Sequence, residues 1–222
     1  MPVAPLPKVR AELVATSRRL HQMGWVANHD GNLSVRLTGD RLLITPTAYS
    51  KLDVDDASLI IVDLAGKVLE GRKKPFSELE LHLAAYRARP EVEVVIHAHP
   101  PTATAFGLVG LELGPIAMPE IVVSLGDSIP TVPRAMPRTP EAVKGVEAAA
   151  AKVDAMLLAG NGALTLGSDL NQALLRMELV EHYAKILSVA RSLGQVQPLA
   201  PADVARLLEA RAKAGLGPKK PL

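Results

Sequence analysis

Two histidines, His97 and His99, stand one residue apart directly after a short β-branched run. In an extended chain, residues i and i+2 point to the same side, so the two imidazoles are expected to converge on one point. Imidazole nitrogen is a common metal ligand, and the chain has no cysteine that could serve instead. The pattern therefore predicts a metal site held by nitrogen and oxygen. It leaves open a second interpretation, in which the histidines are polar residues at the end of a strand.

The elements around this pair are expected to place it at an edge of a sheet. The run 94–96 is typical of a buried strand, and two prolines after the histidines end it where solvent or a substrate has access. A helix predicted over residues 78–89 precedes the strand, with Ser77 as its N-cap and Glu78 in its first turn. A carboxylate beside a divalent ion can act as general base. The helix dipole also explains Glu78 without any catalysis.

The remaining pattern predicts an α/β fold with a mainly antiparallel sheet. Strands are expected at residues 35–37, 41–44, 59–62, 67–69, 154–158 and 163–166, and further helices at 9–23, 139–152, 169–192 and 202–214. Between residues 102 and 138, prolines and glycines leave only a short helix at 102–106. Length and hydrophobic content predict a single domain over residues 1–222.

Composition excludes several classes of function. The chain has 25 basic and 23 acidic residues, a net charge of +2, and no basic stripe interleaved with aromatics, so we expect no nucleic-acid partner. No segment approaches the roughly 20 apolar residues of a membrane span, and the N-terminal residues do not resemble a signal peptide. We therefore expect a cytoplasmic protein that does not bind membranes.

Seven short motifs together carry a family resemblance. They are Gly31-Asn32-Leu33-Ser34-Val35-Arg36, Ile44-Thr45-Pro46-Thr47, Lys74-Pro75-Phe76-Ser77-Glu78, His82-Leu83-Ala84-Ala85-Tyr86, Arg89-Pro90, Val95-Ile96-His97-Ala98-His99 and Asp127-Ser128-Ile129-Pro130. In order and spacing they resemble class II aldolases of the fuculose-phosphate type, over about residues 8–192, which leaves a C-terminal helical tail at about 200–216. That superfamily also holds ribulose-phosphate epimerases, methylthioribulose-phosphate dehydratases and adducin-like non-enzymes. The resemblance implies a three-layer α/β/α sandwich and a homotetramer with active sites at subunit contacts.

The resemblance also implies roles for single residues. His97 and His99 match two zinc ligands of the family, with manganese or cobalt as other candidate ions, and Glu78 matches its acid/base carboxylate. The family grips a substrate phosphate at the positions of Asn32, Thr47 and Ser77. The implied reaction is the cleavage or formation of a C–C bond in a small keto-sugar or sugar phosphate, through an enediolate that the metal stabilises.

Two departures concern the metal and the proton donors. Asn161 stands where the family has its third zinc histidine, and an amide is a poor zinc ligand. His182 is a candidate to compensate, because a strand of about 20 Å runs outward from Asn161 and a helix of similar length returns. The alternative is that this histidine on a long helix is packed in the core or exposed on the surface. The neighbouring subunit's tyrosine of the family has no clear match here. Glu120 lies where the related dehydratases place a second acid/base glutamate, and it is otherwise a solvated loop residue.

Two further departures weaken the grip on phosphate. Phe76 replaces the first serine of a pair, and Ala48 replaces a loop glycine among the phosphate-binding positions. His29, near the same loop, either restores a donor or is a plain turn residue. An unphosphorylated substrate therefore stays open. The alternatives to an aldolase are a dehydratase, an epimerase or a decarboxylase of the same superfamily, or an adducin-like binding protein without catalysis.

Overall fold

The computed structural model describes residues 5–136 and 139–219, so the ends of the predicted domain, residues 1–4 and 220–222, lie outside the described residues. Its centre is an eight-stranded sheet in the order β4-β3-β2-β1-β5-β8-β7-β6. The paired strands run antiparallel, apart from the parallel pair β6 and β7. The strands are β1 (Asn32–Arg36), β2 (Arg41–Ile44), β3 (Ile60–Asp63), β4 (Val68–Glu70), β5 (Val94–Ala98), β6 (Thr131–Val132), β7 (Ala155–Leu158) and β8 (Ala163–Gly167).

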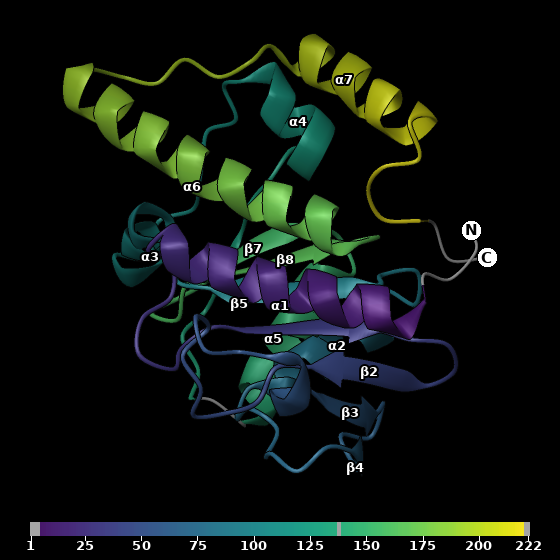
Figure 1. Cartoon of the computed structure of the whole chain (residues 1–222). Helices are drawn as coiled ribbons and strands as arrows, with labels where there is room; N and C mark the ends of the chain where they lie inside the picture. Colours follow the sequence, from purple (N-terminus) through teal and green to yellow (C-terminus); the bar gives the residue numbers. More distant parts are fainter. Residues whose placement is uncertain (1–4, 137–138, 220–222) are drawn as a thin grey trace.

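Helices cover both faces of this sheet. They are α1 (Leu6–Gln22), α2 (Leu79–Ala88), α3 (Pro101–Leu108), α4 (Pro119–Leu125), α5 (Pro140–Ala150), α6 (Leu170–Leu193) and α7 (Pro201–Lys213), with a 3-10 turn, η1 (Asp56–Ser58). Figure 1 shows α1 and α6 over one face and α2 and α5 over the other, with α4 and α7 packed against each other farther out. The three-layer α/β/α sandwich with a mainly antiparallel sheet is thus confirmed.

Alternation along β5 divides the core into two parts. Val94, Ile96 and Ala98 pack with α1, α3 and α6, while Val95 packs with α2 and α5. Because side chains alternate between the faces of a strand, His97 points to the same face as Val95. The strand that carries the histidine pair is therefore buried on both faces, between β1 and β8.

Two local predictions were wrong. Glu78 itself occupies the N-cap position of α2 and makes no side-chain cap hydrogen bond, so Ser77 is not the N-cap residue. Glu120 lies in the first turn of α4 and not in a loop. Pro119 begins α4 at a position where its missing N–H costs nothing, a signal that the proline-rich context hid. Among the described residues, no helix combines the length and apolar character that a membrane span needs.

Ion pairs with a buried aspartate connect the C-terminal helix α7 to the core. Asp154, at the start of β7, is fully buried and contacts the guanidinium groups of Arg89, Arg176 and Arg211. Arg211 belongs to α7 and also donates to the backbone oxygen of Val123 in α4, at 2.5 Å. One buried carboxylate therefore links α7, α4 and the sheet.

Candidate active site

The two histidines converge as predicted. His97 ends up fully buried near the end of β5, and His99 follows the strand with its side chain 29% exposed. Their Nε2 atoms lie 2.9 Å apart. Two zinc–nitrogen bonds of about 2.0–2.1 Å span any separation up to about 4 Å, so both atoms can bind one ion. The pair fits two ligand positions of a divalent cation, while one side of His99 remains open to solvent.

Glu78 lies beside this pair and is held by two amides. Its Oε2 atom lies 3.9 Å from His97 Nε2 and accepts a hydrogen bond from Asn32 Nδ2 at 3.0 Å. Its Oε1 atom accepts a hydrogen bond from Asn161 Nδ2 at 2.5 Å. Each carboxylate oxygen therefore has its own amide donor, so Asn32, predicted to grip phosphate, already uses one N–H on Glu78.

Sheet pairing explains why residues so far apart in the sequence meet here. Asn32 in β1 lies opposite His97 in β5. Asn161 sits in the β7–β8 turn between two glycines with positive φ. A Cβ atom on Gly162 would lie 2.2 Å from the backbone oxygen of Ala98, so only glycine lets this turn approach the histidine strand so closely. That approach brings Asn161 to Glu78.

Burial sets the protonation states of the site. It lowers the pKa of His97 to about 4, although Glu78 acts in the opposite direction. His97 is therefore neutral at pH 7 and keeps a lone pair for a metal. Burial raises the pKa of Glu78, but His97 and the hydrogen bonds from Asn161 and Asn32 outweigh it, so the pKa lies well below the ordinary value. Glu78 is a carboxylate at neutral pH and can accept a proton.

Two charged residues that the sequence motifs did not indicate, Asp30 and Lys51, lie near the site. Asp30 Oδ2 lies 3.4 Å from His99 Nδ1, the usual place for a carboxylate that orients a ligating imidazole. Lys51 is buried, and its Nζ lies 3.0 Å from the backbone oxygen of Tyr49 and 3.5 Å from that of His29. Burial lowers the pKa of Lys51 to about 8, while Asp30 raises it. In the sequence, the position of Asp30 two residues before Asn32 could have indicated that it belongs to the site. No feature of the sequence indicated Lys51.

The predicted phosphate-binding residues lie on neighbouring loops. Lys51 reaches the loop of His29, and the backbone N–H of Thr47 donates to Lys74, three residues before Ser77. Ala48 has a φ of 57°, the left-handed conformation that favours the glycine of the family. The other altered residue, Phe76, is buried and packs against His82, with ring centroids 4.9 Å apart.

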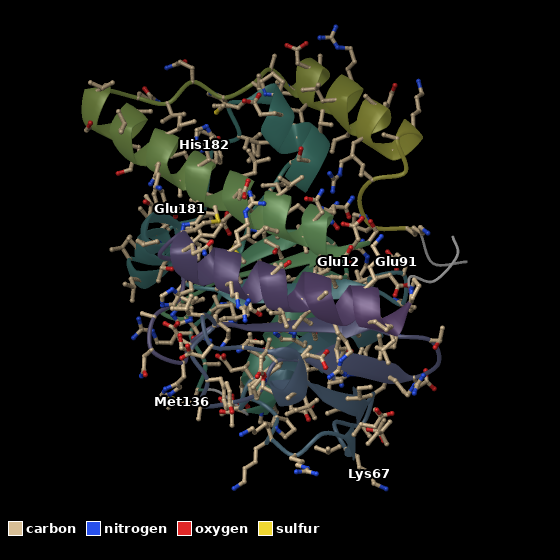
Figure 2. All side chains as sticks on the ribbon, viewed as in Figure 1. Glu12, Lys67, Glu91, Met136, Glu181 and His182 are labelled. Atoms are coloured by element: carbon tan, nitrogen blue, oxygen red, sulfur yellow. The ribbon has the colours of Figure 1, made fainter. Side chains whose placement is uncertain are left out.

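His182 does not reach the histidine pair. Figure 2 labels it on α6 next to Glu181; the His182 side chain is exposed, whereas the buried carboxylate of Glu181 accepts hydrogen bonds from the first turn of α3. His182 and Glu120 both line a separate surface hollow of about 720 Å³, together with Trp25. Strand and helix lengths alone did not predict which side of α6 His182 faces, since one residue changes the direction by about 100°.

A third metal ligand of the usual kind is absent from the described part of the chain. Within residues 5–136 and 139–219, no group of three or more histidine, cysteine, aspartate or glutamate side chains is arranged to hold a metal ion. Two tyrosine hydroxyls are also committed elsewhere: Tyr86 contacts Ser34 and Tyr183 donates to the backbone oxygen of Pro115. Neither of these two tyrosines is therefore placed as the proton donor of the family; the third tyrosine of the chain, Tyr49, has its ring centroid 5.0 Å from Lys73 Nζ.

Comparison with known proteins finds similarity over most of the chain. The family model described as Class II Aldolase and Adducin N-terminal domain matches residues 11–188. A 3-oxo-tetronate 4-phosphate decarboxylase from Pectobacterium atrosepticum is 32% identical over 207 residues, which are 90% of this chain and 92% of the relative. An L-fuculose phosphate aldolase from Escherichia coli is 30% identical over 203 residues, 91% of this chain and 93% of the relative. A solved structure of an L-fuculose 1-phosphate aldolase has a TM-score of 0.86 at 28% identity, covering 94% of this chain and 97% of the other.

These similarities extend over most of both chains, and the matched residues 11–188 include every residue discussed at the site. They confirm the resemblance carried by the seven motifs. The chain belongs to the class II aldolase and adducin family.

Proposed function

We propose that this protein is a metal-dependent lyase acting on a small keto-sugar phosphate, in which it breaks or forms the C–C bond between the carbon adjacent to the carbonyl group and the carbon beyond it. The observation that carries the proposal is the convergence of two imidazole nitrogens, 2.9 Å apart, beside a carboxylate held by two amides. The named relatives support it, because an aldolase and a 3-oxo acid decarboxylase both cleave such a bond. An adducin-like scaffold needs none of these three side chains for its fold.

His97 and His99 would hold the divalent cation, with zinc proposed and manganese or cobalt as alternatives. When bound, the cation supplies positive charge that stabilises the electron pair left by the broken bond. Glu78 carries the proton, since it is ionised at neutral pH and lies 3.9 Å from His97 Nε2. Thr47 and Ser77, on adjoining loops, would hold the substrate phosphate.

Decarboxylation is a second candidate, favoured by one observation. Aldol cleavage needs two proton transfers: one from the hydroxyl group of the departing carbon and one to the enediolate carbon. Decarboxylation needs only the second, because carbon dioxide leaves without a proton. Among the described residues, Glu78 is the carboxylate beside His97, Asp30 is engaged with His99 Nδ1, and the hydroxyls of Tyr86 and Tyr183 are bonded elsewhere. One proton-transfer group is enough for decarboxylation, provided that Glu78, which is ionised, first takes a proton from solvent and then gives it to the enediolate carbon.

We also propose that the chain works as a cytoplasmic homotetramer with its sites at subunit contacts. The support is the family resemblance and the hollow that contains Glu120 and His182. A neighbouring subunit could present Glu120 as a second acid/base group. The mass of the assembly in solution tests the tetramer.

The decisive experiment is the metal content of the purified, tag-free chain. We expect one divalent ion per chain in the wild type, retention in a His21→Ala control on α1, and loss in the double variant His97→Ala, His99→Ala. Incubation with keto-sugar phosphates and 3-oxo acid phosphates then separates the two reactions, because one releases an aldehyde and the other carbon dioxide. A wild-type chain that binds no zinc, manganese or cobalt after soaking would refute the lyase proposal.

A further inference from the structure

Asn161 occupies the position at which the family has a third metal ligand, yet its contact in this fold is with a carboxylate. Its Nδ2 atom lies 2.5 Å from Glu78 Oε1, while Asn32 Nδ2 lies 3.0 Å from Glu78 Oε2. We infer that Asn161 is a positioning residue, which together with Asn32 fixes the orientation of the Glu78 carboxylate, and that it is not a replacement metal ligand. The role of Asn161 in catalysis rests on the proposed function, whereas its hydrogen bond to Glu78 is independent of that function.

The chemistry of the partner decides which end of the amide faces Glu78. An ionised carboxylate only accepts hydrogen bonds, so an amide 2.5 Å away must present its N–H. A turn that put Oδ1 in the place of Nδ2 would bring two acceptors into contact and remove a donor from Oε1. Hydrogen bonds to an ionised group are among the stronger ones, so this rearrangement is costly.

The turn that carries Asn161 fixes the position of its backbone beside Glu78 and the histidine strand. Gly160 and Gly162 have φ values of 75° and 71°, and Asn161 donates its backbone N–H to Leu158 at 2.8 Å. A Cβ on Gly162 would also lie 2.5 Å from His99 Cδ2. The turn is therefore packed directly against the histidine strand, which fixes where the amide begins.

Two amides that each occupy one oxygen determine how Glu78 can act. The carboxylate cannot rotate without breaking at least one of the two bonds. With Asn161 removed, Oε1 loses its donor, and Asn32 alone leaves the carboxylate free to turn toward His97, 3.9 Å away. Asn161 thus acts through Glu78, and its effect should vanish when Glu78 is absent.

A double-mutant cycle in the metal-free chain tests this dependence. The variants are Asn161→Ala, Glu78→Ala and their combination, compared by urea unfolding. In the wild-type background we expect Asn161→Ala to raise the unfolding equilibrium constant about tenfold or more, since a bond to a charged group is lost. In the Glu78→Ala background the same change should have an effect of about twofold or less. Equal effects in both backgrounds would overturn the inference.

The same Asn→Asp substitution at two positions provides a matched comparison. Asn161→Asp keeps the shape of the side chain but replaces its donor by a second acceptor facing Glu78, so it should destabilise the chain more than Asn161→Ala does. Asn171→Asp, at an exposed position of α6, makes the same chemical change away from the site and should shift the unfolding constant by about twofold or less. If Asn161→Asp changed the unfolding constant no more than Asn171→Asp does, the hydrogen bond between Asn161 and Glu78 would be contradicted.

Metal binding then separates a positioning residue from a ligand. In the Glu78→Ala background, Asn161→Ala should leave the zinc dissociation constant within about twofold and the visible spectrum of bound cobalt unchanged. A loss of about tenfold or more, with an altered cobalt spectrum, would make Asn161 a ligand and overturn the inference. Absence of metal binding in the wild type would instead refute the proposed function, while the metal-free cycle would still decide the role of Asn161.

Discussion

The buried carboxylate of Asp154 gives the sharpest prediction about stability. Asp154 has no exposed surface, and its oxygens lie 3.2 Å from Arg89 Nη2 and 2.8 Å from Arg176 Nη2, with Arg211 in contact as well. Asp154→Asn keeps the shape of the side chain but removes its negative charge. The three guanidinium groups then face one another, and Glu91, 2.5 Å from Arg89, is the nearby carboxylate that remains.

Removing one partner of a buried ion pair costs about 3–5 kcal/mol. Since domains unfold with about 5–15 kcal/mol, Asp154→Asn should remove a third or more of the stability. Arg211→Met should cost less, about 1.5–3 kcal/mol, because Asp154 keeps two guanidinium partners, although the hydrogen bonds of Arg211 to Asp154 and to the backbone oxygen of Val123 are lost. The measurement is urea unfolding at pH 7, comparing midpoints at equal slope. If Asp154→Asn cost less than about 1 kcal/mol, or less than Arg211→Met, the buried carboxylate would not be the common anchor of α7 and the sheet.

Two other predictions follow from single positions. Gly162→Ala should destabilise the chain by about 1–3 kcal/mol more than Gly24→Ala in urea unfolding, because both glycines have φ near +70° but only Gly162 has a backbone oxygen within 4 Å of the added Cβ; equal costs would count against the close approach. Burial lowers the pKa of His82 to about 3, so below about pH 6.5 the unfolded chain binds a proton that the folded chain does not, and stability falls by up to about 1.4 kcal/mol per pH unit. The advantage of the wild type over His82→Gln should therefore shrink between pH 6.5 and 4, and a constant difference would refute this reading.

Local patterns in the sequence were enough to predict most elements and the histidine pair. The i, i+2 rule holds wherever a strand is extended, and it placed His97 and His99 together without any knowledge of the fold. The glycines around Asn161 likewise predicted the turn between β7 and β8. Such features depend on neighbours in the chain, which spacing captures.

What the sequence did not predict depends on contacts between distant segments. The bond between Asn161 and Glu78 joins residues 83 positions apart, and no spacing rule identifies such a pair. The predicted direction of His182 was wrong for a related reason, because the rotation of α6 depends on the residues that it buries against the rest of the fold, Glu181 among them. The helix α4 was missed because prolines and glycines around it suggested an irregular segment.

The position of β5 between β1 and β8 also affects how the chain is made. During synthesis, β5 leaves the ribosome well before β8, its partner from Ala163 onward, and translation at about 5–20 residues per second makes that interval last seconds. For that time one side of a strand rich in valine and isoleucine has unpaired backbone groups, the kind of edge that recruits other chains. Newly made copies that stall before Ala163 should therefore aggregate or require a chaperone, and a complete active site should appear only as the last strand of the sheet is added.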